Sequence, residues 1–447
     1  MKGFIRKKEK IGYGIASLGD TAIYNMLIVY ALYYMTDVVK LSPLTAGNIV
    51  LVSNLINAAS IIVIGFISDR FPIRGRRRIP YMKLSIMPMG IMLVAFFHTI
   101  DASSTIKVYY YGLTMIMLMI SHSVFMVPYE ALGGEITSDS HERTVLRSYA
   151  RFFMGAGNML SVVILLPLVE SLQNRGVSEA AAWFYAIIAI ATIGTVSEVL
   201  TCRLVKEEKN PKQKQMKLKK ILYEYKEIMK LKPMVILCIM IILVNIANIF
   251  SNSNLVYFMK YSMGIEKNYQ ALVLFMTTTF GIIMTPALLI ASERFDKKYV
   301  MTACYIFTGT VFMYFGITGI PSLIVLFVYI FAFSVGTSAY WQLIFSLLYD
   351  VSDIDEYNSG VKRRGSILAA AKVILRFSNA AGTQLLGMVL FLSGYDQNIT
   401  EQSDAAICGI HTAFTYVPGG LFILAAICVI IYPVTTACHK EIVSRMS

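Results

Sequence analysis

Twelve long apolar segments run through the chain, and they constrain its fold more than any other feature. In lipid, a backbone must satisfy its own hydrogen bonds, so a segment of roughly 20 apolar residues crosses a bilayer as a helix. The sequence therefore predicts an all-α integral membrane protein with twelve transmembrane helices. The predicted segments are 11–38, 43–68, 81–99, 105–134, 147–172, 178–204, 233–260, 267–291, 299–318, 320–349, 366–394 and 405–435.

The composition fits a membrane protein better than a soluble one. Charged residues make up 15% of the 447 positions, whereas soluble domains carry about 25%. The net charge of +13 would suit nucleic acid, but the basic residues gather in short loops between apolar segments. We therefore expect this charge to set membrane topology, and we expect no nucleic-acid partner.

Basic and non-basic loops alternate along the whole chain. Basic residues follow every even-numbered segment and also precede the first one. Cytoplasmic loops carry the excess of lysine and arginine in membrane proteins. The sequence therefore predicts a multi-pass protein of the cell membrane with both termini in the cytoplasm.

One long charged stretch divides the twelve segments into two sets of six. It predicts an N-terminal six-helix bundle at 1–204, a cytoplasmic linker at 205–232 and a C-terminal six-helix bundle at 233–447. The sequence ISDRF follows the second segment of one half, and ASERF follows the second segment of the other. Two pseudo-symmetric six-helix bundles of this kind are typical of the major-facilitator fold.

The same two repeats supply candidates for a gate. Each contains an acidic residue followed directly by an arginine. We expect these pairs to close the cytoplasmic side by reaching charged groups of the opposite half. The predicted gate residues are Asp69, Arg70, Glu293 and Arg294.

Patterns typical of enzyme chemistry do not stand out. The six cysteines are scattered and lack the spacing of a metal or redox site. We therefore expect a protein that is not an enzyme and that has no cofactor and no bound metal.

Ionisable side chains within the apolar segments are the strongest candidates for function. Charges are costly in lipid, so such residues face a cavity or each other and mark transport pathways. Asp20 and Tyr24 share one helical face, where Asp20 can bind a substrate hydroxyl, carry a proton or pair with an arginine. The ionisable set is Asp20, His122, Glu130, Arg151, Lys372 and Arg376.

Several of these residues lie in wider patterns. His122 and Glu130 belong to one stripe of the fourth segment, and the guanidinium of Arg376 suits a carboxylate or sugar hydroxyls. Near Arg151, two glycines at 155 and 157 predict close helix packing.

Two further groups can serve either a cavity or the packing of helices. A stripe of asparagines at 245, 248 and 252 suits a polar cavity or hydrogen bonds between helices. Trp341 can stack on a sugar ring or anchor the chain at the membrane interface.

Three loop motifs carry a resemblance to a known family. They are GFISDRFPIRGRRRIPYM, GGEITSDSHERTVLRSYARFF and LLYDVSDIDEYNSGVKRRGSI. Together with the first segment, they resemble the glycoside–pentoside–hexuronide:cation symporter family over nearly the whole chain. The resemblance implies a major-facilitator fold that moves a sugar-type solute with a cation.

The resemblance also implies roles for single residues. Asp20 matches an aspartate of helix 1 that contacts sugar, and Arg151 matches the arginine of an RFF motif. Trp341 matches a cavity tryptophan, and Arg376 keeps the positive charge of a helix 11 lysine. The predicted substrate-binding residues are Asp20, Tyr24, Glu130, Arg151, Trp341 and Arg376.

The second segment departs from the family at the site of the coupling cation. Two aspartates of the family fall on Asn57 and Ile61 here. Sodium needs several oxygen ligands, and Asn57 and Ser60 offer neutral oxygens alone. We therefore expect a proton as the coupling ion in preference to sodium. The predicted cation-coupling residues are Asp20, Asn57, Ser60 and Glu130.

The fourth segment departs as well, because the family's sugar-binding aspartate falls on Met126. The substrate therefore need not be a galactoside, and an anionic sugar held by Arg151 and Arg376 also fits. The sequence predicts a secondary active transporter of a glycoside, pentoside or hexuronide that works by alternating access in the lipid bilayer. The resemblance implies that it functions as a monomer. A transporter of another amphiphilic or drug-like solute, or a non-transporting membrane sensor, stays open as an alternative.

Overall fold

The computed structural model describes residues 6–73, 75–136, 140–207, 225–360, 363–399 and 401–435. Within these ranges, twelve helices are long and apolar enough to cross a membrane. The predicted all-α architecture is confirmed. Most of the twelve observed spans begin and end within four residues of the predicted segments.

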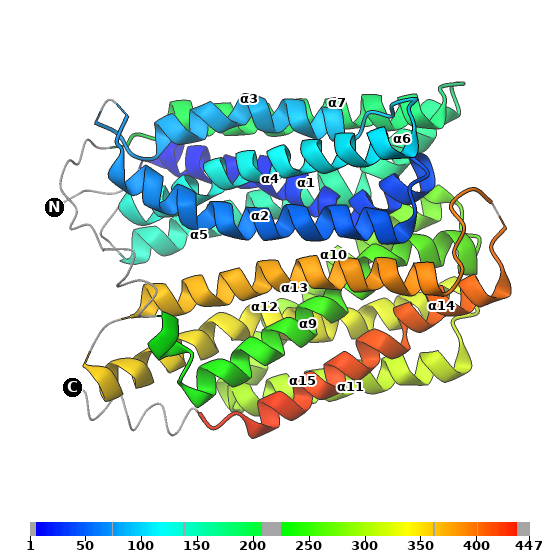
Figure 1. Cartoon of the computed structure of the whole chain (residues 1–447). Helices are drawn as coiled ribbons and strands as arrows, with labels where there is room; N and C mark the ends of the chain where they lie inside the picture. Colours follow the sequence, from blue (N-terminus) through cyan, green and yellow to red (C-terminus); the bar gives the residue numbers. More distant parts are fainter. Residues whose placement is uncertain are drawn as a thin grey trace. The chain divides into compact units, whose positions relative to one another are not determined.

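The chain divides into two compact units (Figure 1). The first holds the described residues up to 207 together with 265–275 and 396–399, and the second holds the other described residues. The helices of the first half are α1 Lys7–Tyr33, α2 Pro43–Arg70, α3 Ile79–Phe96, α4 Ser104–Glu135, α5 Ser140–Asn158, α6 Leu165–Gln173 and α7 Glu179–Leu204, with π-helical turns η1 Tyr34–Val38 and η2 Met159–Val163. The second half holds α9 Lys232–Tyr257, the π-helical turn η3 Phe258–Ser262, α10 Lys267–Arg294, α11 Lys297–Thr318, α12 Leu323–Ser359, α13 Arg364–Leu392, α14 Asp404–Phe414 and α15 Tyr416–Ile431.

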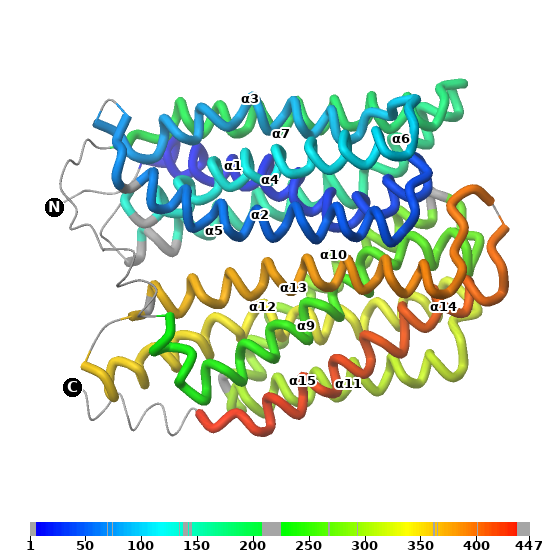
Figure 2. The backbone as a smooth tube through the Cα atoms, viewed as in Figure 1, coloured from blue at the N-terminus to red at the C-terminus, as the bar shows by residue number. Residues whose placement is uncertain are grey.

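The two units repeat one packing order. In the first, α1 packs against α5 and α7, while α3 packs against α4 and α7 (Figure 2). In the second, α9 packs against α13 and α15, while α11 packs against α12 and α15. The first helix of each half thus packs against the corresponding two helices of its own half. This gives the weak sequence repeat a structural counterpart.

Local sequence sets where the helices begin and end. Ser42, Ser178 and Ser322 each accept a hydrogen bond from a backbone N–H three residues later, which caps α2, α7 and α12. Gly360 ends α12 with a left-handed φ of 67°, a conformation that glycine adopts without strain.

Helix α12 runs ten residues beyond its predicted end at 349. The extension has the sequence DVSDIDEYNS, which the third of the loop motifs places in a loop. Hydropathy detects the part of a helix that lies in lipid, so a polar continuation escapes it. The acidic residues of this extension are therefore held on a rigid helix.

The prediction for the two glycines of α5 is half right. A Cβ on Gly157 would press against the backbone carbonyl of Leu18, so α1 and α5 do meet closely there. A Cβ on Gly155 would meet open space, so close packing at Gly155 is wrong. Residues two positions apart point to nearly opposite sides of a helix, so only one of these two glycines faces the neighbouring helix.

Replacing Gly157 with alanine is therefore expected to destabilise the protein by roughly 1–3 kcal/mol through overpacking. Gly155→Ala is the matched control, and it should leave stability unchanged or slightly higher, since alanine favours a helix. Thermal unfolding of both variants in detergent checks this. Equal melting temperatures would contradict the close contact.

The predicted linker lies mostly on residues 208–224, outside the described residues. At its far end Lys230 Nζ lies 2.6 Å from Glu227 Oε1, and this hydrogen bond lowers the pKa of the Glu227 carboxyl. At its near end Glu207 is buried against the first unit, where it contacts the start of α3.

Candidate functional site

A buried pair of ionisable groups joins α1 to α4. Asp20 is 9% exposed, and its Oδ1 lies 2.7 Å from Nε2 of His122, which is 3% exposed. The distance is that of an ion pair when the imidazole is protonated, although the two atoms are not aligned as a linear hydrogen bond. Asp20 therefore pairs with a histidine, a partner that sequence reasoning did not choose.

Aromatic and hydroxyl groups hold this pair in place. The ring of Tyr24 stacks on His122 with centroids 5.3 Å apart. Two turns along α4 from His122, Tyr129 donates a hydrogen bond to the backbone oxygen of Tyr13 at 2.9 Å and contacts Ser17 Oγ at 2.8 Å. These contacts fix α1 against α4, and the structure thus brings Asp20, Tyr24 and His122 together.

The neutral oxygens predicted for a cation lie on α2. The buried Asn57 accepts a hydrogen bond from Ser123 of α4, and Ser60 donates to the carbonyl of Ile56 in its own helix. Among the residues that the structure describes, no three acidic, histidine or cysteine side chains come together as a metal site.

Two predicted substrate ligands of the first unit lie on helix surfaces. Glu130 of α4 and Arg151 of α5 are both exposed. Asn25 of α1 donates to Asn158 of α5 at 2.8 Å, which sets the register of α5 against α1. Both charged side chains are thus exposed, unlike the buried Asp20 pair.

In the second unit, the asparagine stripe of α9 serves helix packing. Asn245 donates to the hydroxyl of Tyr340 at 2.8 Å, and Asn248 accepts from Thr337 at 3.0 Å. Both partners belong to α12. Of the two interpretations left open, hydrogen bonds between helices therefore hold for these two asparagines.

Trp341 sits beside this contact with a side chain that is 44% exposed. Its ring meets Tyr340 edge to face at 5.0 Å, and Tyr340 is itself held by Asn245. The indole is thereby oriented by a buried neighbour while its other face stays open. Arg376 of α13 is half-buried in the same unit.

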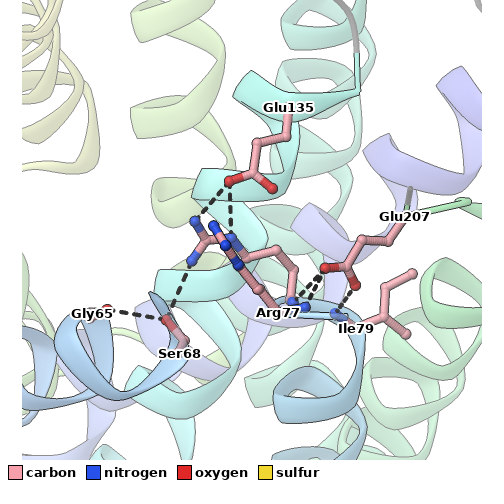
Figure 3. A network of polar contacts seen from close by, with 7 residues as sticks. Gly65, Ser68, Arg77, Ile79, Glu135 and Glu207 are labelled. Carbon is pink, nitrogen blue, oxygen red and sulfur yellow. Dashed lines mark hydrogen bonds and ion pairs between the residues drawn. The ribbon is translucent and has the colours of Figure 1, made fainter. Parts of the chain in front are cut away.

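The Glu207 carboxylate belongs to a network of polar contacts within the first unit (Figure 3). Its carboxylate accepts hydrogen bonds from three successive backbone N–H groups at the start of α3, those of Arg77, Arg78 and Ile79, at 2.5, 2.8 and 2.9 Å. A helix N-terminus attracts negative charge because its first N–H groups lack partners within the helix. The end of α7 is thus tied to the start of α3.

The Arg78 side chain extends this network to α4. Its Nη2 lies 2.7 Å from Glu135 Oε1, and its Nη1 donates to Ser68 Oγ at 3.3 Å. The second unit repeats the plan, since Lys297 at the start of α11 lies 2.8 Å from Asp350 Oδ2 of α12, and Lys298 donates to the backbone oxygen of Tyr432 beyond α15. The start of α3 is thus tied to α2, α4 and the segment after α7, and the start of α11 is tied to α12 and the segment after α15.

The predicted gate residues lie at the ends of α2 and α10. The Arg70 guanidinium sits 5.4 Å from the ring centre of Phe66 and is exposed, as is Arg294. The side chains of Asp69 and Glu293 lie outside the described residues. Contacts of these four residues with the opposite half therefore stay a prediction.

Sequence reasoning missed several buried acids, among them Glu198 of α7, whose side chain is 0% exposed. The signal was present, because an isolated carboxyl in the apolar run TVSEVLTC stands out as much as Asp20 does.

The two units and the ionisable groups buried in their helices define a membrane transporter of the major-facilitator fold. A solved structure of a D-xylose–proton symporter superposes with a TM-score of 0.68 at 15% identity, covering 94% of this chain and 96% of that one. The profile of the MFS/sugar transport protein family matches residues 12–436, so the chain belongs to that family.

Curated relatives match over nearly their whole length. The inner membrane symporter YicJ of Escherichia coli is 26% identical, covering 98% of this chain and 95% of the relative. The glucuronide carrier protein homolog of Escherichia coli is 24% identical, covering 97% and 94%. The predicted membership of the symporter family is confirmed.

Proposed function

We propose that this protein is a symporter that carries a glycoside, pentoside or hexuronide across the cell membrane together with a proton. The observation that carries the proposal is the Asp20–His122 pair, a buried acid and base 2.7 Å apart that joins α1 to α4 in a sugar-transporter fold. Histidine and carboxylate side chains within membrane helices form the proton relays of many transporters. Both termini lie in the cytoplasm, as the basic loops indicate.

Substrate binding is assigned to the predicted residues of both units. The exposed Arg151 and Glu130 offer hydrogen bonds to sugar hydroxyls, and Arg151 can pair with a hexuronide carboxylate. Trp341 offers an oriented ring for the C–H face of a sugar. The relative named as a glucuronide carrier supports an acidic sugar as one candidate substrate.

Proton coupling is favoured over sodium coupling by the chemistry of α2. Asn57 and Ser60 contribute no negative charge, and their polar groups already bond to Ser123 and Ile56. A hard cation such as sodium is bound by several oxygens, of which carboxylates bind best.

Uptake by the purified protein in proteoliposomes tests this function. Labelled neutral glycosides and hexuronides are offered under a proton gradient or a sodium gradient. Accumulation of at least one sugar driven by protons alone is expected. Accumulation driven by sodium alone would reject proton coupling, and failure of every sugar to enter would reject sugar transport in favour of another solute or a sensor.

A further inference from the structure

Glu198 is the most deeply buried acid described in either unit. Its side chain is 0% exposed, and neither carboxyl oxygen has a hydrogen-bond partner among the described residues. This burial is within the protein itself, because α7 packs against α1 and α3. The group is therefore shielded from water whatever surrounds the bundle.

An ionised carboxylate at this position would have neither water nor a counter-charge. The cost of burying such a charge is several kcal/mol, which a protein avoids by keeping the group neutral. The neutral acid carries one proton.

The position of Glu198 links this proton to Asp20. A Cβ on Gly19 would lie 2.5 Å from Ser197 Oγ, so α1 and α7 touch at the residues that precede Asp20 and Glu198. Asp20 and Glu198 therefore lie at a contact between two packed helices. Because two nearby negative charges repel, ionisation of one acid disfavours ionisation of the other.

The remaining titratable groups around Glu198 are few. Lys83 of α3 is exposed and faces Cys202, one turn along α7 from Glu198. His122 of α4 contacts Asp20, which lies on the neighbouring helix α1. Helix α6, with Glu170, is joined to the opposite end of α7 by residues 174–178.

We propose that Glu198 is a proton-binding site of the transporter and that its proton is the coupling ion. In the transport cycle the acid O–H bond breaks and its proton leaves to water on one side of the membrane; the carboxylate then takes a proton from water on the other side. The charge state of Asp20, set by His122 and by the solute, controls when the proton leaves. This proposal rests on the proposed function.

The first test needs no sugar. Infrared spectra of the full chain in lipid at neutral pH should show the carbonyl stretch of a protonated carboxyl, and Glu198→Gln should remove it. Glu179→Gln, at the exposed start of the same helix, is the matched control and should keep the band. A band that survives in Glu198→Gln, or is absent from the wild type, would overturn the proposal.

The second test separates coupling from binding. Glutamine mimics the neutral acid but cannot release a proton, so Glu198→Gln should lose proton-driven accumulation by about tenfold or more while exchange of labelled sugar at equal concentrations stays within about twofold. Accumulation at the wild-type level would overturn the coupling role, and so would a parallel loss of exchange. Failure of wild-type transport with every sugar would reject the proposed function, and the infrared result would still stand.

Discussion

Proteoliposomes that carry Asp20→Asn are expected to lose proton-driven sugar accumulation and sugar exchange together. Asparagine keeps the size of the side chain but removes the charge that faces His122 at 2.7 Å. Removing one partner of a buried ion pair costs about 3–5 kcal/mol, which corresponds to roughly 100-fold or more in uptake rate. Any residual uptake should no longer respond to the proton gradient.

The matched control is Asp101→Asn, in the exposed loop between α3 and α4. This substitution also removes one negative charge, but from a residue outside the buried Asp20–His122 pair. The variant should therefore transport as the wild type does. Wild-type accumulation by Asp20→Asn would contradict the role of Asp20. Sodium-driven uptake that survives the substitution would instead assign the cation to Asn57 and Ser60.

The joint loss expected for Asp20→Asn differs from the effect expected for Glu198→Gln. Asp20 is assigned both to the solute and to the proton, whereas Glu198 is assigned to the proton alone. Measured side by side, the two variants therefore tell a binding carboxylate from a coupling carboxylate.

Glu207→Ala is expected to cause the largest loss of stability of the substitutions considered. The variant leaves the N–H groups of Arg77, Arg78 and Ile79 without their acceptor. Each unsatisfied buried donor costs about 1–3 kcal/mol, so the total is roughly 3 kcal/mol or more. For a unit of this size, that lowers the melting temperature by about 6–12 °C.

Two further variants make this result specific. Glu207→Gln keeps one carbonyl acceptor and should lose less stability than Glu207→Ala. Lys206→Ala changes the exposed neighbouring residue and should stay within about 0.5 kcal/mol of the wild type. Equal melting temperatures of Glu207→Ala and Lys206→Ala in detergent would contradict the role of Glu207 in holding α3 to α7.

The sequence by itself determined the twelve helices. They follow from hydropathy, which acts along the chain, because each transmembrane helix satisfies its own backbone hydrogen bonds. The α12 extension past 349 was not predicted, because a polar helix outside the membrane carries no hydropathy signal. The sequence also identified Asp20 and His122 separately as ionisable residues within apolar segments.

The tertiary structure alone decided which of these residues meet. Asp20 and His122 are 102 positions apart, and their pairing depends on the rotation of α1 against α4. The same kind of rotation turns Gly157 toward Leu18 but not Gly155. Burial of Glu198 and capping of α3 by Glu207 depend on how α7 packs, because the partners of a helix face are set by side-chain packing between helices and not by the periodicity of one helix.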